Sequence, residues 1–183
     1  MTTQTVSNQT ESATYVADPI HSSIGFAVRH NGVSTFRSGF DSFEARLSGG
    51  ESPRLGGRVD VSSIEVADEQ LRGHLLSPEF FDADRYPRLR FDSTELSVTE
   101  DGELRVAGEL EIRGRIHEVE AGGRLARLGA DIVGGERIGL SLEASVDRRG
   151  FGLDWDAELP SGGQVLDYEV RIAVELELVR KEG

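Results

Sequence analysis

A strict two-residue alternation of apolar and charged side chains is the feature that most constrains how this chain can fold. In ELRVAGELEIRG, residues 103–114, the apolar side chains fall on one face and the glutamates and arginines on the other. This is the period of a β-strand with one buried face. The pattern returns in ERIGLSLEASV (136–146) and YEVRIAVELELV (168–179). In the last of these, the side chains predicted to face inward are Val170, Ile172, Val174, Leu176 and Leu178.

Five weaker strand patterns and one helical pattern complete the chain. Strands are predicted at residues 23–30, 34–47, 57–61, 89–97 and 116–128. Glycine-containing turn sequences are found at residues 31–32, 49–50, 101–102, 122–123, 134–135 and 162–163. Residues 68–76 have helical spacing after Asp68, an aspartate suited to cap a helix N-terminus. The chain is therefore predicted to be all-β with one short helix.

The number and length of the strands favour a barrel over a two-sheet sandwich. About eight strands with one apolar face each are compatible with both architectures. Several predicted strands are longer than usual, and long strands with one apolar face enclose a deep interior. We expect a single antiparallel eight-stranded β-barrel over residues 14–183, with the helix near one end. Residues 1–13 are expected to be a disordered polar tail, and because they lack the apolar stretch of a signal peptide, a cytoplasmic protein is expected.

Charge and residue types argue against several classes of function. A formal charge of -13 repels nucleic-acid phosphates and anionic lipid headgroups, so neither nucleic-acid binding nor electrostatic membrane docking is expected. The chain has no cysteine, which removes thiolate metal sites and cysteine nucleophiles. No metal site is expected from the histidines either, because no two have ligand-like spacing on a strand or helix; they are His21, His30, His74 and His117. The serines lie outside any G-x-S-x-G motif, so no catalytic residue and no cofactor are predicted.

The aromatic side chains are the strongest candidates for a binding site. They fall on apolar strand faces or beside strand ends, where the interior of a barrel or its mouth would be. For any single phenylalanine, filling of the core is the simpler interpretation. As a group they indicate an apolar ligand cavity, because filled barrels are packed mostly with branched aliphatic residues. The group comprises Phe26, Phe36, Phe40, Phe80, Phe81, Phe91, Phe151 and Trp155.

Several separate blocks of this sequence resemble the YceI-like, polyisoprenoid-binding proteins. The resemblance covers about residues 15–180. It begins in DPIHSSIGFAVRHNG (18–32) and is most distinctive over residues 59–94, which include Arg72, His74, the Phe80-Phe81-Asp82 triplet and Tyr86-Pro87. It continues in LEIRG (110–114), DRRGFGLDW (147–155) and LELVR (176–180). The blocks occur in the order typical of the family.

This resemblance implies a lipocalin-like barrel whose apolar interior holds a long isoprenoid, isoprenoid-quinone or fatty acyl chain. It implies a carrier or binding protein, with the segment from Arg72 to Tyr86 near the opening. Arg72, His74 and the eight aromatic residues are then the predicted ligand-binding set. The chain departs from the family pattern at Gly73, Leu76 and Glu111. A homodimer is one oligomeric state that the sequence leaves open.

Two other functions compete with the carrier. One is an enzyme acting on a hydrophobic substrate at the barrel mouth, with Arg72, His74 and Asp82 as its polar groups. The other is a stress or interaction module whose barrel interior is fully packed. If residues 80–81 are extended, their side chains point to opposite sides. One of Phe80 and Phe81 would then line the cavity and the other would pack in the core.

Overall fold

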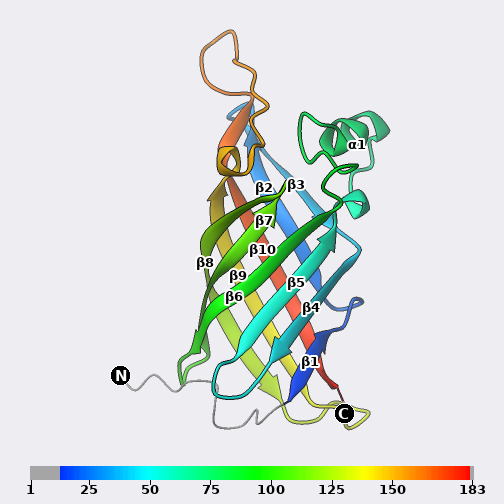
Figure 1. Ribbon diagram of the computed structural model, residues 1–183, viewed down its shortest axis with the longest axis vertical. Coiled ribbons are helices and arrows are strands. Elements are labelled where there is room, and N and C mark those ends of the chain that lie inside the picture. The colour runs from blue at the N-terminus through cyan, green and yellow to red at the C-terminus, as the bar shows by residue number, and fades with distance from the viewer. Residues whose placement is uncertain (1–12, 182–183) are drawn as a thin grey trace.

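Strand pairing closes the sheet of this chain into a barrel (Figure 1). The computed structural model describes residues 13–181. Neighbouring strands are antiparallel in the closed order β1-β4-β5-β6-β7-β8-β9-β10-β1. The prediction of an eight-stranded antiparallel barrel with one short helix is therefore confirmed. The tail predicted for residues 1–13 lies outside the described residues except for Ala13, which is buried.

Ten strands, one α-helix and two short 3-10 helices follow one another along residues 13–181. The strands before the helix are β1 (Thr14–Ala17), β2 (Ser23–His30), β3 (Ser34–Phe40), β4 (Phe43–Ser48) and β5 (Arg54–Asp60). A short 3-10 helix, η2 (Val61–Ser63), precedes α1 (Glu69–Leu76). The remaining elements are β6 (Arg88–Val98), β7 (Glu103–Ile112), β8 (Arg115–Leu128), β9 (Arg137–Asp147), the 3-10 helix η3 (Arg148–Phe151) and β10 (Leu166–Lys181).

Two positions in the barrel wall each contain two strand segments, β1 with β2 at one and β4 with β3 at the other. β1 and β2 both pair with the long strand β10, β1 with residues 178–181 and β2 with residues 166–175. The single strand predicted at 34–47 is wrong, because β3 and β4 are separated at Asp41 and Ser42. The backbone N–H of Asp41 donates to the Ser63 carbonyl, and the Ser42 carbonyl accepts from the N–H of Asp60. These bonds to the 60–63 turn interrupt the strand.

The turn predicted at residues 122–123 is also wrong, because both glycines lie inside β8. Gly123 pairs with Leu104 on β7 and with Leu142 on β9. A Cβ atom at this position would collide with the backbone of Ser141. This glycine therefore permits close approach of two strands rather than a reversal of the chain.

The two ends of the barrel differ in their packing. One end of the barrel is where β1 begins and β10 terminates (Figure 1). A buried cluster fills the interior there. Its least exposed members, each at most 1% exposed, are Tyr15, Leu47, Leu104, Ile138 and Leu178. We call this the packed end. The opposite end carries α1 and the segment 152–165 (Figure 1), and we call it the helix end.

α1 forms where the sequence predicts it. The Asp68 carboxylate accepts a hydrogen bond of 2.7 Å from the backbone N–H of Leu71, which caps the helix N-terminus. The helix stops at Ser77, before Pro78, because proline disfavours helical backbone in the residue that precedes it. Leu75 is the buried residue of the helix and anchors it to the barrel. Within residues 13–181, no helix has the length and hydropathy needed to cross a bilayer.

Candidate functional site

A cavity of about 630 Å³ occupies the barrel interior between the packed end and the helix end. At the packed end it is lined by Leu142 and Leu176, which belong to the buried cluster there. At the helix end its lining includes the solvent-exposed residues His30, Ser34 and Leu71. We call these three residues the mouth. Cavities of this size are typical of sites that bury most of a drug-sized ligand.

The alternating pattern predicted the orientation of β10 correctly. Val170, Ile172 and Val174 line the cavity, and so does Leu176. Leu178, one step further along, is fully buried in the packed end.

Inward-facing side chains beside the cavity are half-buried rather than buried. Examples are Phe26 on β2, Val146 on β9 and Ile172 on β10. In a filled core, side chains that point inward lose nearly all their exposure, as the five residues of the packed end do. The interior between the packed end and the helix end is therefore hollow, unlike the fully packed barrel that was one of the alternatives.

Nine of the ten predicted ligand-binding residues line this cavity. They are Phe26, Phe36, Phe40, His74, Phe80, Phe81, Phe91, Phe151 and Trp155. Arg72 does not line it; its guanidinium donates to the Ser62 carbonyl at 2.6 Å. Arg72 is excluded from the cavity because its side chain points back to the η2 turn. Leu71, His74 and Leu75 on the same helix face the cavity instead.

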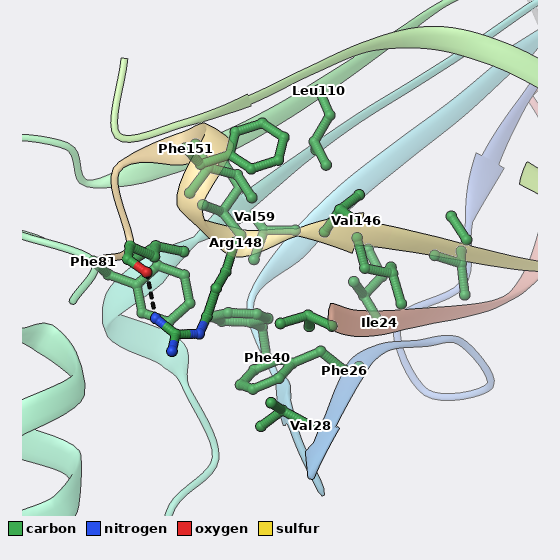
Figure 2. Close-up of a pocket in the computed structure, with 18 of the residues that line it drawn as sticks. Ile24, Phe26, Val28, Phe40, Val59, Phe81, Leu110, Val146, Arg148 and Phe151 are labelled. Carbon is green, nitrogen blue, oxygen red and sulfur yellow. Dashed lines mark hydrogen bonds between the residues drawn. The ribbon is translucent and has the colours of Figure 1, made fainter. Parts of the chain in front are cut away.

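Aromatic rings from three separate segments meet on one side of the cavity (Figure 2). Phe81 contacts Phe26 and Phe40 with ring centroids 6.4 and 6.0 Å apart, both edge to face. Phe26 also packs on Phe36 at 6.2 Å. Such arrangements place the positive edge of one ring against the negative face of another. They hold the α1–β6 connection against the β2–β3 hairpin.

A second aromatic group lies at the helix end. The Phe80 ring is 4.9 Å from the His74 ring and 5.5 Å from Trp155, and His74 is 5.8 Å from Trp155. Phe80 and Phe81 thus join different groups, yet both line the cavity. The expectation that one lines it and the other packs elsewhere is wrong because the segment is not extended. The N–H of Phe81 bonds back to the Leu75 carbonyl, and Asp82 has a positive φ of 51°.

The polar groups considered for catalysis each have a partner of their own. His74 Nε2 lies 2.7 Å from a Glu79 carboxylate oxygen. Buried Asp82 forms an ion pair of 3.5 Å with Arg85. Arg72 bonds to Ser62, so within residues 13–181 no hydrogen bond or ion pair joins Arg72, His74 and Asp82 to one another.

Arg148 is a buried cation beside this apolar cavity, and sequence reasoning did not select it. Only 3% of the residue is exposed, and it lines the cavity. Its guanidinium donates to four backbone carbonyls, those of Leu153, Trp155, Leu166 and Asp167, and one bond is dashed in Figure 2. Burial lowers the pKa of Arg148 below its ordinary value, while the charge of Asp156 acts in the opposite direction. An arginine next to another arginine in a loop sequence resembles a surface residue, so the sequence carried no sign of this burial.

Arg113 ties two connections of the helix end together. Its Nη1 donates to the Phe80 carbonyl and to the Gly152 carbonyl, both at 2.8 Å. Arg113 and Gly114 form the two-residue turn between β7 and β8 with φ of 51° and 68°, values typical of hairpin turns of this length. The side chain does not line the cavity, so its contribution is to hold the segments that surround the site.

One group of potential metal ligands lies away from the cavity, at Asp18, His21 and Glu177. Their ligand atoms lie within 4.8 Å of one another. Arg137 Nη1 already lies 3.3 Å from Asp18 and 2.6 Å from Glu177. The guanidinium supplies the positive charge that these carboxylates need, so this group is explained as an ion-pair network.

Comparison with known proteins identifies a family model and related sequences that match this chain. The YceI-like domain model matches residues 15–178. A UPF0312 protein from Staphylococcus aureus is 26% identical over 168 residues, covering 89% of this chain and 95% of the relative. A UPF0312 protein from Vibrio cholerae is 28% identical over 166 residues, covering 87% and 86% respectively.

Solved structures share the fold at low sequence identity. Burkholderia cenocepacia BcnA aligns with a TM-score of 0.72 and 19% identity, covering 88% of this chain and 98% of BcnA. A polyisoprenoid binding domain from Saccharophagus degradans, implicated in plant cell wall breakdown, aligns with a TM-score of 0.70 and 14% identity. That alignment covers 93% of this chain and 100% of the domain. Because the family model spans nearly all of the barrel strands, the chain belongs to the YceI-like domain family.

Proposed function

We propose that this protein binds a long apolar chain inside the barrel and acts as its carrier. The candidate ligands are a polyisoprenoid, an isoprenoid quinone or a fatty acyl chain. The observation that carries the proposal is the cavity of about 630 Å³ with aromatic and aliphatic side chains along its length. The polyisoprenoid binding domain of Saccharophagus degradans, which shares the fold, supports a hydrophobic ligand.

Burial of an apolar chain in this cavity supplies enough free energy for binding. Each methylene-sized group contributes about 0.8 kcal/mol when it leaves water. Association itself costs roughly 4 to 15 kcal/mol. Micromolar affinity corresponds to about 8 kcal/mol. Burial of three isoprene units, at about 4 kcal/mol each, reaches it when association costs about 4 kcal/mol, and burial of four units reaches it up to a cost of about 8 kcal/mol. Because the walls are held by the strand ladder and by two aromatic groups, little of this free energy is lost in ordering the protein.

Binding explains the arrangement of the site better than catalysis does. An enzyme on a hydrophobic substrate needs an acid, a base or a nucleophile within reach of the reacting atoms. Here His74 is engaged with Glu79, and Asp82 with Arg85. Membership of the YceI-like family and the polyisoprenoid binding domain among the structural neighbours also favour a binding protein.

Native mass spectrometry tests this function directly. The purified protein is analysed before and after organic extraction, and the extracted protein is then offered a polyprenol, an isoprenoid quinone and a fatty acid. We expect an apolar small molecule to copurify, or at least one of the three to bind with one-to-one stoichiometry. A protein that carries nothing and takes up none of the three would refute the carrier function.

A further inference from the structure

Arg148 is the only buried arginine among residues 13–181, and it lies at the cavity. It has no ion-pair partner among these residues. A charge removed from water is stabilised when it is paired, and an unpaired one is costly. Four carbonyl dipoles solvate this guanidinium, but they carry no net negative charge. The side chain is therefore provided with hydrogen bonds and still lacks a counter-charge in direct contact.

Asp156 does not fill that role by contact. Its carboxylate accepts a hydrogen bond of 2.8 Å from the Tyr168 hydroxyl, and Asp156 is exposed. Its charge acts on Arg148 from a distance and raises the pKa of the guanidinium, against the larger lowering caused by burial. The inner side of Arg148, which faces the cavity, is lined by apolar groups such as Phe81 and Phe151 (Figure 2).

The hydrogen-bond capacity of Arg148 is not used up. A guanidinium has five N–H donors in a fixed fork. Nε uses one, for Asp167; Nη1 uses two, for Leu153 and Trp155; and Nη2 uses one, for Leu166. The second N–H of Nη2 has no hydrogen-bond acceptor among the described residues. A single remaining donor on this buried side chain suits one oxygen of a small anion, whereas a diphosphate group would need several donors.

From this geometry we infer that the cavity selects chains that end in a carboxylate, with the carboxylate at Arg148 and the tail directed to the packed end. The inference rests on the proposed function, since it names the class of chain that the same cavity takes. The orientation follows from the lining. Arg148 begins η3, on the side of the helix end, while the other extreme of the cavity is lined by Leu55, Leu142 and Leu176.

Three ligands with one chain and different end groups test this inference: palmitate, methyl palmitate and hexadecylamine. The affinity of each ligand is measured by its displacement of the fluorescent probe N-phenyl-1-naphthylamine from the full-length protein at neutral pH. Ligand concentrations are kept below those at which the ligand aggregates. A charge-assisted hydrogen bond in a buried setting favours palmitate over the ester by about tenfold to a hundredfold. We expect hexadecylamine to bind most weakly, because its cation would lie beside Arg148.

Two variants separate the charge of Arg148 from its structural contacts. Arg148→Met removes the cation and should abolish the preference for palmitate over the ester. Arg113→Met also removes two bonds to backbone carbonyls of the helix end, but Arg113 does not line the cavity. This control should shift all three affinities together and keep the preference. If Arg148→Met does not fold, the ranking of the three ligands by the unmodified protein decides alone.

The outcomes separate failure of the carboxylate site from failure of chain binding. Equal affinity of the unmodified protein for palmitate and its ester, or tighter binding of the ester, overturns the carboxylate site and leaves chain binding intact. Loss of the preference in Arg113→Met as well as in Arg148→Met also overturns it. Failure of all three ligands, together with failure of the polyprenol and the quinone, overturns the carrier function itself.

Discussion

Filling the cavity with a larger side chain should weaken ligand binding without destabilising the fold. Ala144 on β9 lines the cavity, is half-buried and pairs with Ile172 of β10. In Ala144→Phe the added ring enters existing empty space, so its burial contributes about 1.5 to 3 kcal/mol before rotamer and fitting costs. We expect a change in the free energy of unfolding between zero and a gain of about 2 kcal/mol, which raises Tm by roughly 2 to 4 °C for each kcal/mol.

The ring of Ala144→Phe takes the place of part of the ligand. If it excludes three or four methylene-sized groups, at about 0.8 kcal/mol each, affinity falls roughly fiftyfold to two-hundredfold. Val106→Phe is the matched control, because Val106 is 2% exposed and belongs to the packed end without lining the cavity. Overpacking there should cost about 1 to 3 kcal/mol. Urea denaturation and probe displacement measure the two effects. Equal destabilisation by both substitutions would show that the interior at Ala144 is filled, and the reasoning would fail.

Three further substitutions have distinct expected results. Phe81→Ala should destabilise the fold by less than the roughly 3 to 5 kcal/mol typical of a buried phenylalanine, because the new void joins an existing cavity. It should also weaken chain binding. Urea denaturation and ligand titration measure the two effects, and a full loss of stability at unchanged affinity would contradict this prediction. His74→Ala should keep most of the affinity for an apolar chain, and a loss beyond tenfold in the same titration would instead mean that His74 is essential to the site. The pKa of Asp131 is lowered from 3.8 to about 2, first by the hydrogen bond from Arg137 and then by backbone N–H groups. Its stabilising effect is therefore present above pH 3.8 and lost as the pH falls through about 2. Asp131→Asn should be less stable than the unmodified protein at neutral pH and show a flatter decline in acid denaturation between these values, and an identical decline in both proteins would contradict the assignment.

Strands with a solvent-facing side could be predicted from the sequence, because their charges alternate with apolar residues. This holds for β7, β9 and β10, where the register of the inward side chains was predicted as well. β1 was missed, since its four residues are too short to show a period. The break between β3 and β4 was missed because it depends on hydrogen bonds to a turn some 20 residues away in the chain, at 60–63.

The candidate site could be predicted only as far as its apolar residues. Bulky aromatic side chains in a β-protein go inside, so nine of them, counting His74, were placed at the cavity by residue type and block order. Arg72 and Arg148 show where this reasoning stops. Both are arginines in loop-like or helical segments, and only the path of the chain turns one to the Ser62 carbonyl and buries the other beside the cavity.

The contrast between the two ends implies that one strand will exchange its amide hydrogens in two regimes. β10 runs from the cavity, where Val170 and Ile172 are half-buried, to the packed end, where Leu178 is fully buried. Amides deep in a packed cluster exchange only when the whole domain unfolds, whereas those beside a hollow exchange through smaller openings. We therefore expect deuterium to enter the first half of β10 sooner than the second. A bound chain should slow exchange in the first half alone, so the packed end stays closed while ligand enters and leaves at the helix end.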